Sequence, residues 1–411
     1  MEGIICRKGK EIIVNPRPPL IQDLDSLPFP KRDLLKNSLL KYAYLSTSRG
    51  CNGNCSFCWH KRFWDQNCKT SWRGRSPDNI VLEIQQIVKE HGINRFWFID
   101  DSFEDYDSSC PDRMWKLVQK IIDSGLNISY ETYMRAEIQR KLSDKDFKLL
   151  KDSGFVGVIF GIESGNQEDL KLYQKIATVE DNYKAIEVFR KHDIAVDIGF
   201  INFNPYSTLD RLYQNVCYLK KTGFASVLYY LVERCAVTKL SSLYDRVKKD
   251  GLLLNEDNIV CHSYRYVDED VGSLSKYLYY KYHENENSKE YFYAKKIGSY
   301  IREELKLLNH IKHQYKDNSQ IVNLITHSEN NAWEILWEAN ENNSNWFVAL
   351  LEITEHGWDV DKAEKVCAEF LSLSRIKKMS DAIEQIRLKL YLDLNRSGVA
   401  PGQYFNLNGN S

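Results

Sequence analysis

Residues 144–165 read DKDFKLLKDSGFVGVIFGIESG and place a helical pattern directly before a strand pattern. Apolar residues at helical spacing predict a helix over the first part, and the Ser-Gly that follows fits the glycine that often ends a helix. The apolar run VGVIFGI after it predicts a strand. This stretch therefore predicts one repeat unit of an α/β fold.

The same unit recurs on both sides of this stretch. Between about residues 42 and 232, β-type runs alternate with helical stretches six times, and several helices end in His-Gly, Ser-Gly or Thr-Gly. Such alternation predicts a parallel sheet with right-handed crossovers. We therefore predict an α/β fold with a partial (β/α)6 TIM-like barrel over residues 41–250, in which ASVLYYLV, residues 225–232, is the sixth strand. Functional residues of such barrels gather at the carboxyl ends of the strands.

Different patterns flank the predicted barrel. Residues 1–40 hold five of the nine prolines and predict an extended N-terminal arm. Residues 251–411 predict a mainly helical C-terminal domain for substrate binding or docking, because three stretches carry apolar residues at helical spacing: 293–308, 330–340 and 379–394. His310 and His313, in the sequence HIKH, lie at helical spacing, and we expect them on a solvated helix face. We expect the last residues, 400–411, to be frayed.

Charge and hydropathy exclude several classes of protein. Lys plus Arg number 56 and Asp plus Glu number 57 in 411 residues, so no basic field favours a nucleic acid partner. No apolar run approaches the length that spans a bilayer, so we expect no membrane association. The N-terminus lacks the pattern of a signal peptide, and we expect a cytoplasmic protein.

Three of the ten cysteines are clustered. Cys51, Cys55 and Cys58 lie in RGCNGNCSFCWH, residues 49–60, whereas the other seven stand alone. Three thiolates in a glycine-containing loop suit a [4Fe-4S] cluster, and three protein ligands leave the fourth iron open to an external ligand. Two alternatives remain: His60 completes a zinc knuckle, or Cys68 supplies the fourth ligand of a ferredoxin-type cluster.

The cysteine spacing resembles the CxxxCxxC motif of radical S-adenosylmethionine (SAM) enzymes, and Phe57 matches the usual aromatic residue before the last cysteine. The resemblance extends over about residues 18–250 and is to the subgroup whose radical domain normally follows a cobalamin-binding domain. Five stretches carry it: IQDLDSLPFPKRDLL (21–35), SRGCNGNCSFC (48–58), RGRSPDNIVLEI (73–84), FIDDSF (98–103) and GIESGNQEDL (161–170).

The chain departs from that subgroup in two respects. Only about 40 residues precede the predicted barrel, too few for a cobalamin domain, and no DxHxxG sequence occurs. The fifth strand ends in FINFNPYST, residues 200–208, where the subgroup has a glycine-proline-glycine turn. The resemblance therefore does not imply cobalamin-dependent methyl transfer.

The resemblance implies two cofactors, a [4Fe-4S] cluster held by the cysteine trio and SAM, which is cleaved to a 5′-deoxyadenosyl radical. It implies that Glu163 and Ser164 bind the ribose or methionine part of SAM, that Asp100 and Asp101 meet its ammonium group and that Arg135 pairs with its carboxylate. A structural role is the alternative to SAM binding for several of these residues. Glu163 and Ser164 would form a strand-ending turn, Asp101 a helix cap and Arg135 a surface ion pair.

The resemblance also suggests a reaction. Among family members without cobalamin or a second cluster, we favour maturases of ribosomally synthesised peptides, including epimerases in which a cysteine returns a hydrogen atom. Cys367 is our candidate donor, with a buried core cysteine as the alternative. A dehydratase or rearrangement enzyme for a sugar or antibiotic precursor is the second hypothesis, and a metal-binding interaction module the third. Flavodoxin or ferredoxin is the expected electron donor.

Overall fold

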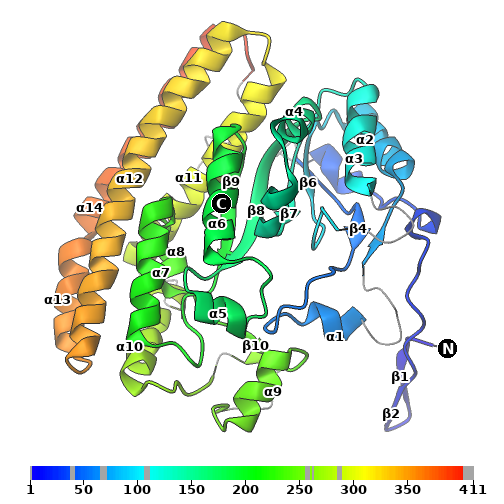
Figure 1. Cartoon of the computed structure of the whole chain (residues 1–411). Coiled ribbons are helices and arrows are strands. Elements are labelled where there is room, and N and C mark those ends of the chain that lie inside the picture. Colours follow the sequence, from blue (N-terminus) through cyan, green and yellow to red (C-terminus); the bar gives the residue numbers. More distant parts are fainter. Residues whose placement is uncertain are drawn as a thin grey trace.

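A computed structural model describes residues 2–37, 42–64, 72–105, 112–254, 260–261, 263–284 and 289–400. Its centre is a parallel five-stranded sheet with the order β3-β6-β7-β8-β9. The strands are β3 (Ala43–Leu45), β6 (Arg95–Phe98), β7 (Ser129–Met134), β8 (Phe155–Glu163) and β9 (Ala195–Phe200). The strand order follows the chain order, as successive right-handed βα units require. The predicted partial barrel is confirmed in this part of the chain (Figure 1).

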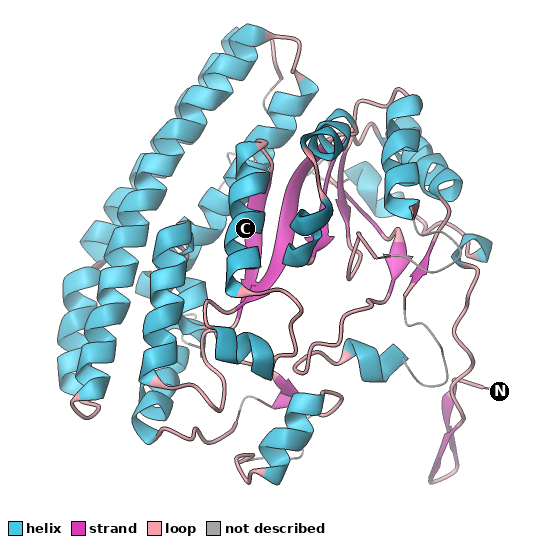
Figure 2. Cartoon of the chain, viewed as in Figure 1, coloured by secondary structure: helices cyan, strands magenta, loops and turns pink. Residues whose placement is uncertain are grey.

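Helices connect successive strands and cover one face of the sheet (Figure 2). Gly92 and Gly223 end the first and last of them in the left-handed conformation, which glycine adopts without a steric penalty. Phe189 packs edge to face on Phe147 and Phe160, with 4.9 Å between ring centroids in both pairs. Aromatic packing between helices and strands thus fills this side of the core. The helices between strands are α2 (Pro77–His91), α3 (Arg113–Asp123), α4 (Asp144–Asp152), α5 (Gln167–Leu172) and α6 (Val179–Lys191), and α7 (Leu209–Thr222) follows the last strand.

The predicted sixth strand at residues 225–232 is wrong. The segment forms the 3-10 helix η4 (Phe224–Ser226) and the short helix α8 (Leu228–Val232). Side chains bind its carbonyl groups, because Asn343 donates to Ala225 O and Asn202 donates to Leu231 O. An apolar run of this length fits a buried helix as well as a buried strand, so periodicity alone does not separate the two. A single parallel bridge between Phe203 and Arg234 stands at the sixth position.

The N-terminal arm is extended only in part. It begins with a hairpin of β1 (Ile5–Lys8) and β2 (Glu11–Val14) and continues through the 3-10 helices η1 (Leu24–Ser26) and η2 (Asp33–Asn37). Farther along, β4 (Ser48–Arg49) pairs with β5 (Arg73–Gly74) and brackets the cysteine loop and helix α1 (His60–Trp64).

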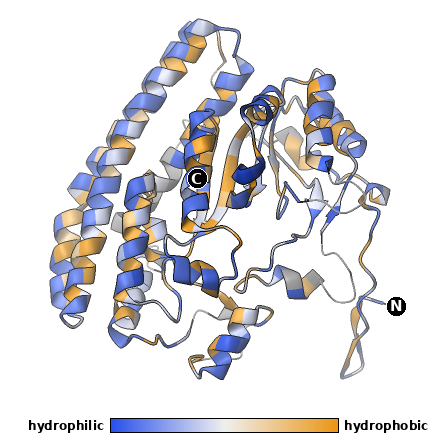
Figure 3. Ribbon diagram, viewed as in Figure 1, coloured by the Kyte–Doolittle hydropathy of each residue, from blue (hydrophilic) through white to orange (hydrophobic). Residues whose placement is uncertain are grey.

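The C-terminal part is helical, as predicted. Figure 3 shows hydrophilic and hydrophobic residues mixed along α12, as the sequence pattern indicates. One hydrophobic core continues from the sheet into these helices, and Phe203 packs on Phe347 with ring centroids 6.1 Å apart. The predicted boundary between residues 250 and 251 stays a prediction. The elements are α9 (Ser242–Lys249), β10 (Val237–Thr238), β11 (Val260–Cys261), α10 (Glu269–Tyr279), the π-helical η5 (Tyr280–Glu284), α11 (Lys289–Gln314), α12 (Ser319–Glu355), α13 (Val360–Phe370) and α14 (Leu373–Arg396).

Two terminal expectations have different outcomes. Residues 401–411 lie outside the described residues, so the frayed tail is not tested. Within the part that is described, no helix is long and apolar enough to cross a lipid bilayer.

Helix α11 packs on the inner face of the sheet, the face turned away from α2, α3, α4 and α6. Lys306 on α11 is 3% exposed and lies 3.0 Å from Glu131 of β7 and 3.8 Å from Asp197 of β9. About one turn of helix before Lys306, Arg302 pairs with Asp197 at 2.8 Å. His310, which was expected in solvent, lies about one turn after Lys306 and is instead buried. A buried ion-pair network thus closes the amino-terminal half of the barrel interior.

We predict that Lys306→Met destabilises the protein by about 3–5 kcal/mol, because it leaves Glu131 and Asp197 buried without their shared cation. Urea unfolding followed by circular dichroism measures the change. Lys148→Met is the matched control, because the Lys148 side chain is 76% exposed in a surface pair with Asp152, and it should unfold like the wild type. Equal midpoints for the two variants would show that the buried pairs contribute nothing.

Candidate functional site

The cysteine loop follows β4 and is held by carboxylates that follow β6. Asp100 is 1% exposed and accepts hydrogen bonds from the backbone N–H groups of Thr47 at 2.6 Å and Ser48 at 2.9 Å. Asp101 accepts from Gly50 N at 3.0 Å, at the start of the loop. These two predicted SAM ligands therefore bind the protein backbone. A direct contact with SAM stays a prediction for both.

A third carboxylate, which the sequence analysis did not single out, continues this set. Asp105 accepts from Asn52 N at 2.7 Å and so binds the loop between the first two cysteines. Its side chain is 3% exposed. The acidic run FIDDSFED after β6 was the available signal, but the spacing does not say which acids turn toward the loop.

The thiols gather around Gly53. A Cβ atom at this position would lie 3.2 Å from Cys51 Sγ and 3.9 Å from Cys55 Sγ, so glycine leaves the space that two thiols need. Burial raises the pKa of the Cys51 thiol to about 12 and that of Cys58 to about 11, and it also raises the pKa of Cys55. Buried thiols of this kind ionise when they coordinate a metal. The loop therefore fits a metal cluster.

The arrangement differs from that of a single-ion site. Among the described residues, no three His, Cys, Asp or Glu side chains converge as ligands of one metal ion. His60, the proposed fourth zinc ligand, directs Nε2 to Asp101 Oδ1 at 3.1 Å. A cubane attaches its cysteines to different irons, so the thiols need not converge on one point. Cys68 lies outside the described residues.

Arg135 lies beside the first cysteine, and its guanidinium is paired with carboxylates. Its guanidinium forms a bidentate pair with Asp105 at 2.6 and 2.8 Å and a third contact with Glu137 at 2.9 Å. Nη1 is also 3.6 Å from Cys51 Sγ. The sequence analysis gave a surface ion pair as the alternative role of Arg135. The structure shows instead that Arg135 connects Asp105 to the cysteine loop. Its predicted contact with the SAM carboxylate is untested.

Glu163 ends β8 on the inner face of the sheet. Its backbone has φ 66°, and a Cβ atom at Gly161 would lie only 2.7 Å from Glu163 Oε1, so the carboxylate lies directly over that glycine. Lys175 Nζ is 3.8 Å away and its side chain is 4% exposed. Burial raises the pKa of Glu163, and the Lys175 ammonium opposes that effect. Sequence reasoning missed Lys175, which no motif marks.

Ser164 belongs to a buried polar network under this edge. Its hydroxyl contacts Asn215 Oδ1 at 2.8 Å and Asp169 Oδ2 at 3.2 Å. Asn204 donates to the same Asp169 and, at 3.0 Å, to Tyr173 OH. The unusual turn after β9 therefore supplies an amide to a network that also holds Ser164. The SAM contact predicted for Ser164 stays a prediction.

Cys367 does not lie with these residues. It is 4% exposed on α13, where Trp346 Nε1 approaches its sulfur at 3.4 Å and Tyr277 OH at 3.5 Å. Figure 1 shows α13 at the outer edge of the helical layer, on the other side of α7 from the cysteine loop. Its predicted role as a hydrogen donor stays a prediction.

Aromatic side chains line the part of the inner face that α11 leaves open. Tyr44, Trp97 and Tyr133, here called the aromatic row, stand on adjacent strands with ring centroids 5.8 and 5.7 Å apart. Tyr44 is 54% and Tyr133 37% exposed. Tyr133 is level with Ile159 of β8, and Gly161 and Glu163 follow on that strand. Strand alternation therefore puts the aromatic row and Glu163 on the same face of the sheet, where the Glu163 side chain is 13% exposed.

A family comparison agrees with this geometry. Residues 45–213 match the model of the Radical SAM superfamily. The uncharacterized methyltransferase PH0819 of Pyrococcus horikoshii is 28% identical over 224 residues, which are 53% of this chain and 46% of that protein. The anaerobic magnesium-protoporphyrin IX monomethyl ester cyclase of Cereibacter sphaeroides is 27% identical over 209 residues, 49% of this chain and 32% of the cyclase. The chain thus spans less than half the length of these relatives.

A solved structure shares the fold across nearly the whole chain. The cobalamin-dependent SAM radical enzyme OxsB, with aqua-cobalamin and SAM bound, superposes with a TM-score of 0.61 at 17% identity. The match covers 96% of this chain and 61% of OxsB. The C-terminal helices are therefore part of the fold that this chain shares with the solved structure.

We predict that Asp100→Asn weakens iron retention about tenfold or more, because partners that orient a metal-binding loop have effects of this size. The measurement is the loss of iron to a chelator after anaerobic reconstitution with iron and sulfide. Asp112→Asn is the control, since Asp112 makes no side-chain cap bond to α3 and pairs with the exposed Lys116 at 3.4 Å. Equal iron loss from both variants would contradict the role of Asp100.

Proposed function

Because residues 45–213 form a radical SAM domain, whose cofactors are a [4Fe-4S] cluster and SAM, we propose that this enzyme abstracts a hydrogen atom from a small-molecule substrate bound on the inner face of the sheet. With both cofactors bound, one-electron cleavage of SAM supplies the 5′-deoxyadenosyl radical that this chemistry needs. Enzymes of this family require a reductant, and flavodoxin or ferredoxin stays a prediction for that partner.

In this proposal, the chain's own residues hold and balance the cofactors. Cys51, Cys55 and Cys58 ligate three irons. Arg135 and Lys175 bring positive charge close to the thiolates, and a cation near a coordinating sulfur stabilises its ionised form. Glu163 is an acceptor for the hydroxyl or ammonium groups of SAM, because its carboxylate lies over Gly161 on the inner face of the sheet.

The observation that carries the substrate class is the aromatic row. Three rings packed side by side on adjacent strands, of which Tyr44 and Tyr133 are exposed, offer aromatic surface on the same face as Glu163. Pockets for small molecules combine such aromatic walls with a few polar groups. The cyclase and the methyltransferase among the relatives are named for small-molecule or methyl-transfer chemistry, which supports this choice. Peptide epimerisation by a peptide maturase stays a prediction.

We predict that reconstituted enzyme forms 5′-deoxyadenosine from SAM and dithionite under anaerobic conditions, and that the Cys51→Ala, Cys55→Ala, Cys58→Ala triple variant forms none. Mass spectrometry measures the product. Zinc in the purified site together with no SAM binding would favour the metal-binding interaction module and overturn the proposal.

We predict that Tyr133→Leu lowers the substrate-dependent formation of 5′-deoxyadenosine several-fold and leaves the substrate-independent formation unchanged, because the ring contacts substrate and not the cluster. A low-molecular-mass fraction of cell extract is the substrate source, with and without peptidase treatment. Tyr280→Leu is the control, because Tyr280 is 68% exposed on η5. Stimulation that peptidase destroys would favour the peptide maturase instead.

A further inference from the structure

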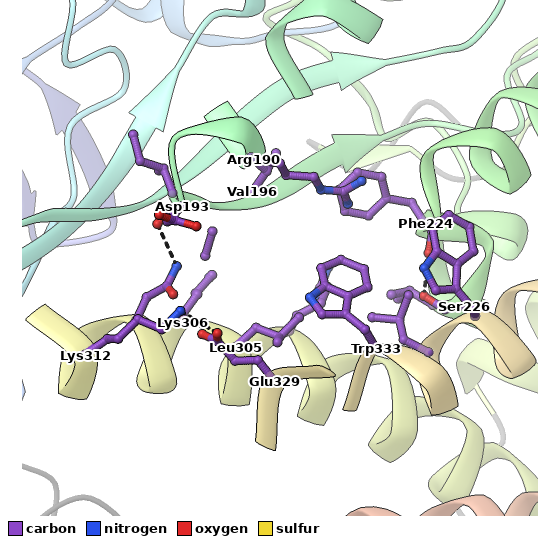
Figure 4. Close-up of a pocket in the computed structure, with 18 residues that line it drawn as sticks. Arg190, Asp193, Val196, Phe224, Ser226, Leu305, Lys306, Lys312, Glu329 and Trp333 are labelled. Carbon is purple, nitrogen blue, oxygen red and sulfur yellow. Dashed lines mark hydrogen bonds and ion pairs between the residues drawn. The ribbon is translucent and has the colours of Figure 1, made fainter. Parts of the chain in front are cut away.

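A cavity of about 360 Å³ lies at the amino-terminal end of β9, away from the strand ends that carry the cysteine loop. Its walls come from the end of α6, the turn after α7, η4, α11 and α12, and Figure 4 shows side chains from these elements facing one another across it. The volume is within the range of small-ligand sites in proteins. None of the residues assigned above to the cluster or SAM lines this cavity.

Arg190 is the unusual group in this cavity. Its guanidinium donates to the Thr222 carbonyl at 2.7 Å and lies over the rings of Phe224 and Trp333, at 4.8 and 5.2 Å from their centroids. Among the described residues it forms no ion pair with a carboxylate. Burial lowers its pKa to about 10. A buried cation without a counterion is costly, so a bound anion would relieve the cost.

A second arginine in the same cavity also favours a bound anion. Arg302 also lines the cavity, and its Nε is buried without a hydrogen-bond partner although its Nη1 is paired with Asp197. Helices α11 and α12 run antiparallel, with Lys312 bound to Glu329. Arg302 stands ten residues before Lys312, about 15 Å along the helix, and so lies toward the Trp337 end.

The opposite end of the cavity has a different character. Asp193 and Lys312 lie there, and Glu329 pairs with that lysine (Figure 4). Asp193 also pairs with Lys151 at 3.1 Å, so both acids at this end have lysine partners, and their remaining oxygens offer acceptors to a hydroxyl or amino group. The walls between the two ends are apolar and aromatic, with Trp333 and Trp337 on α12.

We propose that this cavity binds a planar aromatic carboxylate, with the carboxylate at Arg190 and Arg302 and the ring against Trp333 and Trp337. Arginine pairs with a carboxylate through two parallel hydrogen bonds, and tryptophan offers the flat surface that an aromatic ring needs. A hydroxyl or amino substituent on the far side of the ring faces Asp193 and Glu329. This site is independent of the cluster and of the proposed reaction.

Isothermal titration calorimetry on the full chain tests the site with 2-naphthoate and with 2-naphthamide, its neutral counterpart. We expect 2-naphthoate to bind with a Kd of about 1 mM or tighter, and the amide at least about tenfold more weakly. A hydroxyl at the ring position opposite the carboxylate should tighten binding. No saturable binding of the acid, or equal affinity for acid and amide, would overturn the assignment.

Variants separate the roles of charge and ring. Arg190→Met should weaken 2-naphthoate about tenfold or more and leave the amide unchanged, whereas Trp337→Leu should weaken both. Arg246→Met is the matched control, because its guanidinium lies over the Tyr206 ring at 4.7 Å outside the cavity. Thermal melting checks that each variant is folded, and if Arg190→Met does not fold, Trp337→Leu alone decides the test. Unchanged affinity in the variants, or loss of naphthoate binding when SAM is added, would refute a separate site.

Discussion

The cysteine loop depends on a row of carboxylates at one strand end. Asp100, Asp101 and Asp105 each accept a hydrogen bond from a backbone N–H of the chain between Thr47 and Asn52. A loop that carries three thiols and two glycines has little structure of its own, and hydrogen bonds to its backbone set its shape before any metal binds. The position of β6 relative to β3 therefore decides where the cysteines lie.

Charge balance around this loop is the second constraint. The acids that bind the backbone bring negative charge close to thiols that must ionise, which is unfavourable by itself. Arg135 offsets it by pairing with Asp105 while approaching Cys51, and Lys175 does so between Glu163 and Cys55. Each cation thus serves an acid and a cysteine at once.

Pairing between a lysine and buried carboxylates also decides how much of the inner face of the sheet is covered. Lys306 of α11 fills the amino-terminal half of the barrel interior through Glu131 and Asp197 and lies 5.6 Å from the centroid of the Trp97 ring. Tyr44 and Tyr133, the other two members of the aromatic row, stay exposed. A helix from the C-terminal part therefore sets the depth of the open surface. The shared hydrophobic core makes that helix part of the barrel's own packing.

The predictions made from the sequence differ most from the structure where a residue's partners come from distant segments of the chain. The six-fold alternation and the cysteine spacing depend on neighbouring residues, and the five strands, the helical C-terminal part and the cysteine loop follow from them. Residues 225–232 form short helices instead of a strand, and Asn202 and Asn343, remote in the chain, donate to two of their carbonyl groups. His310 was expected in solvent because only the tertiary fold brings α11 onto β7.

The sequence by itself determined the α/β class and the grouping of three thiols in one loop, because these depend on local periodicity and on spacing along the chain. Only the tertiary structure decided which acids hold the loop, that Arg135 joins Asp105 to Cys51, and that Lys175 accompanies Glu163. It also decided that Ser164 lies in a buried network and Cys367 in a helical core. The physical reason is that side-chain partners are chosen by three-dimensional packing, and no spacing along the chain encodes that choice.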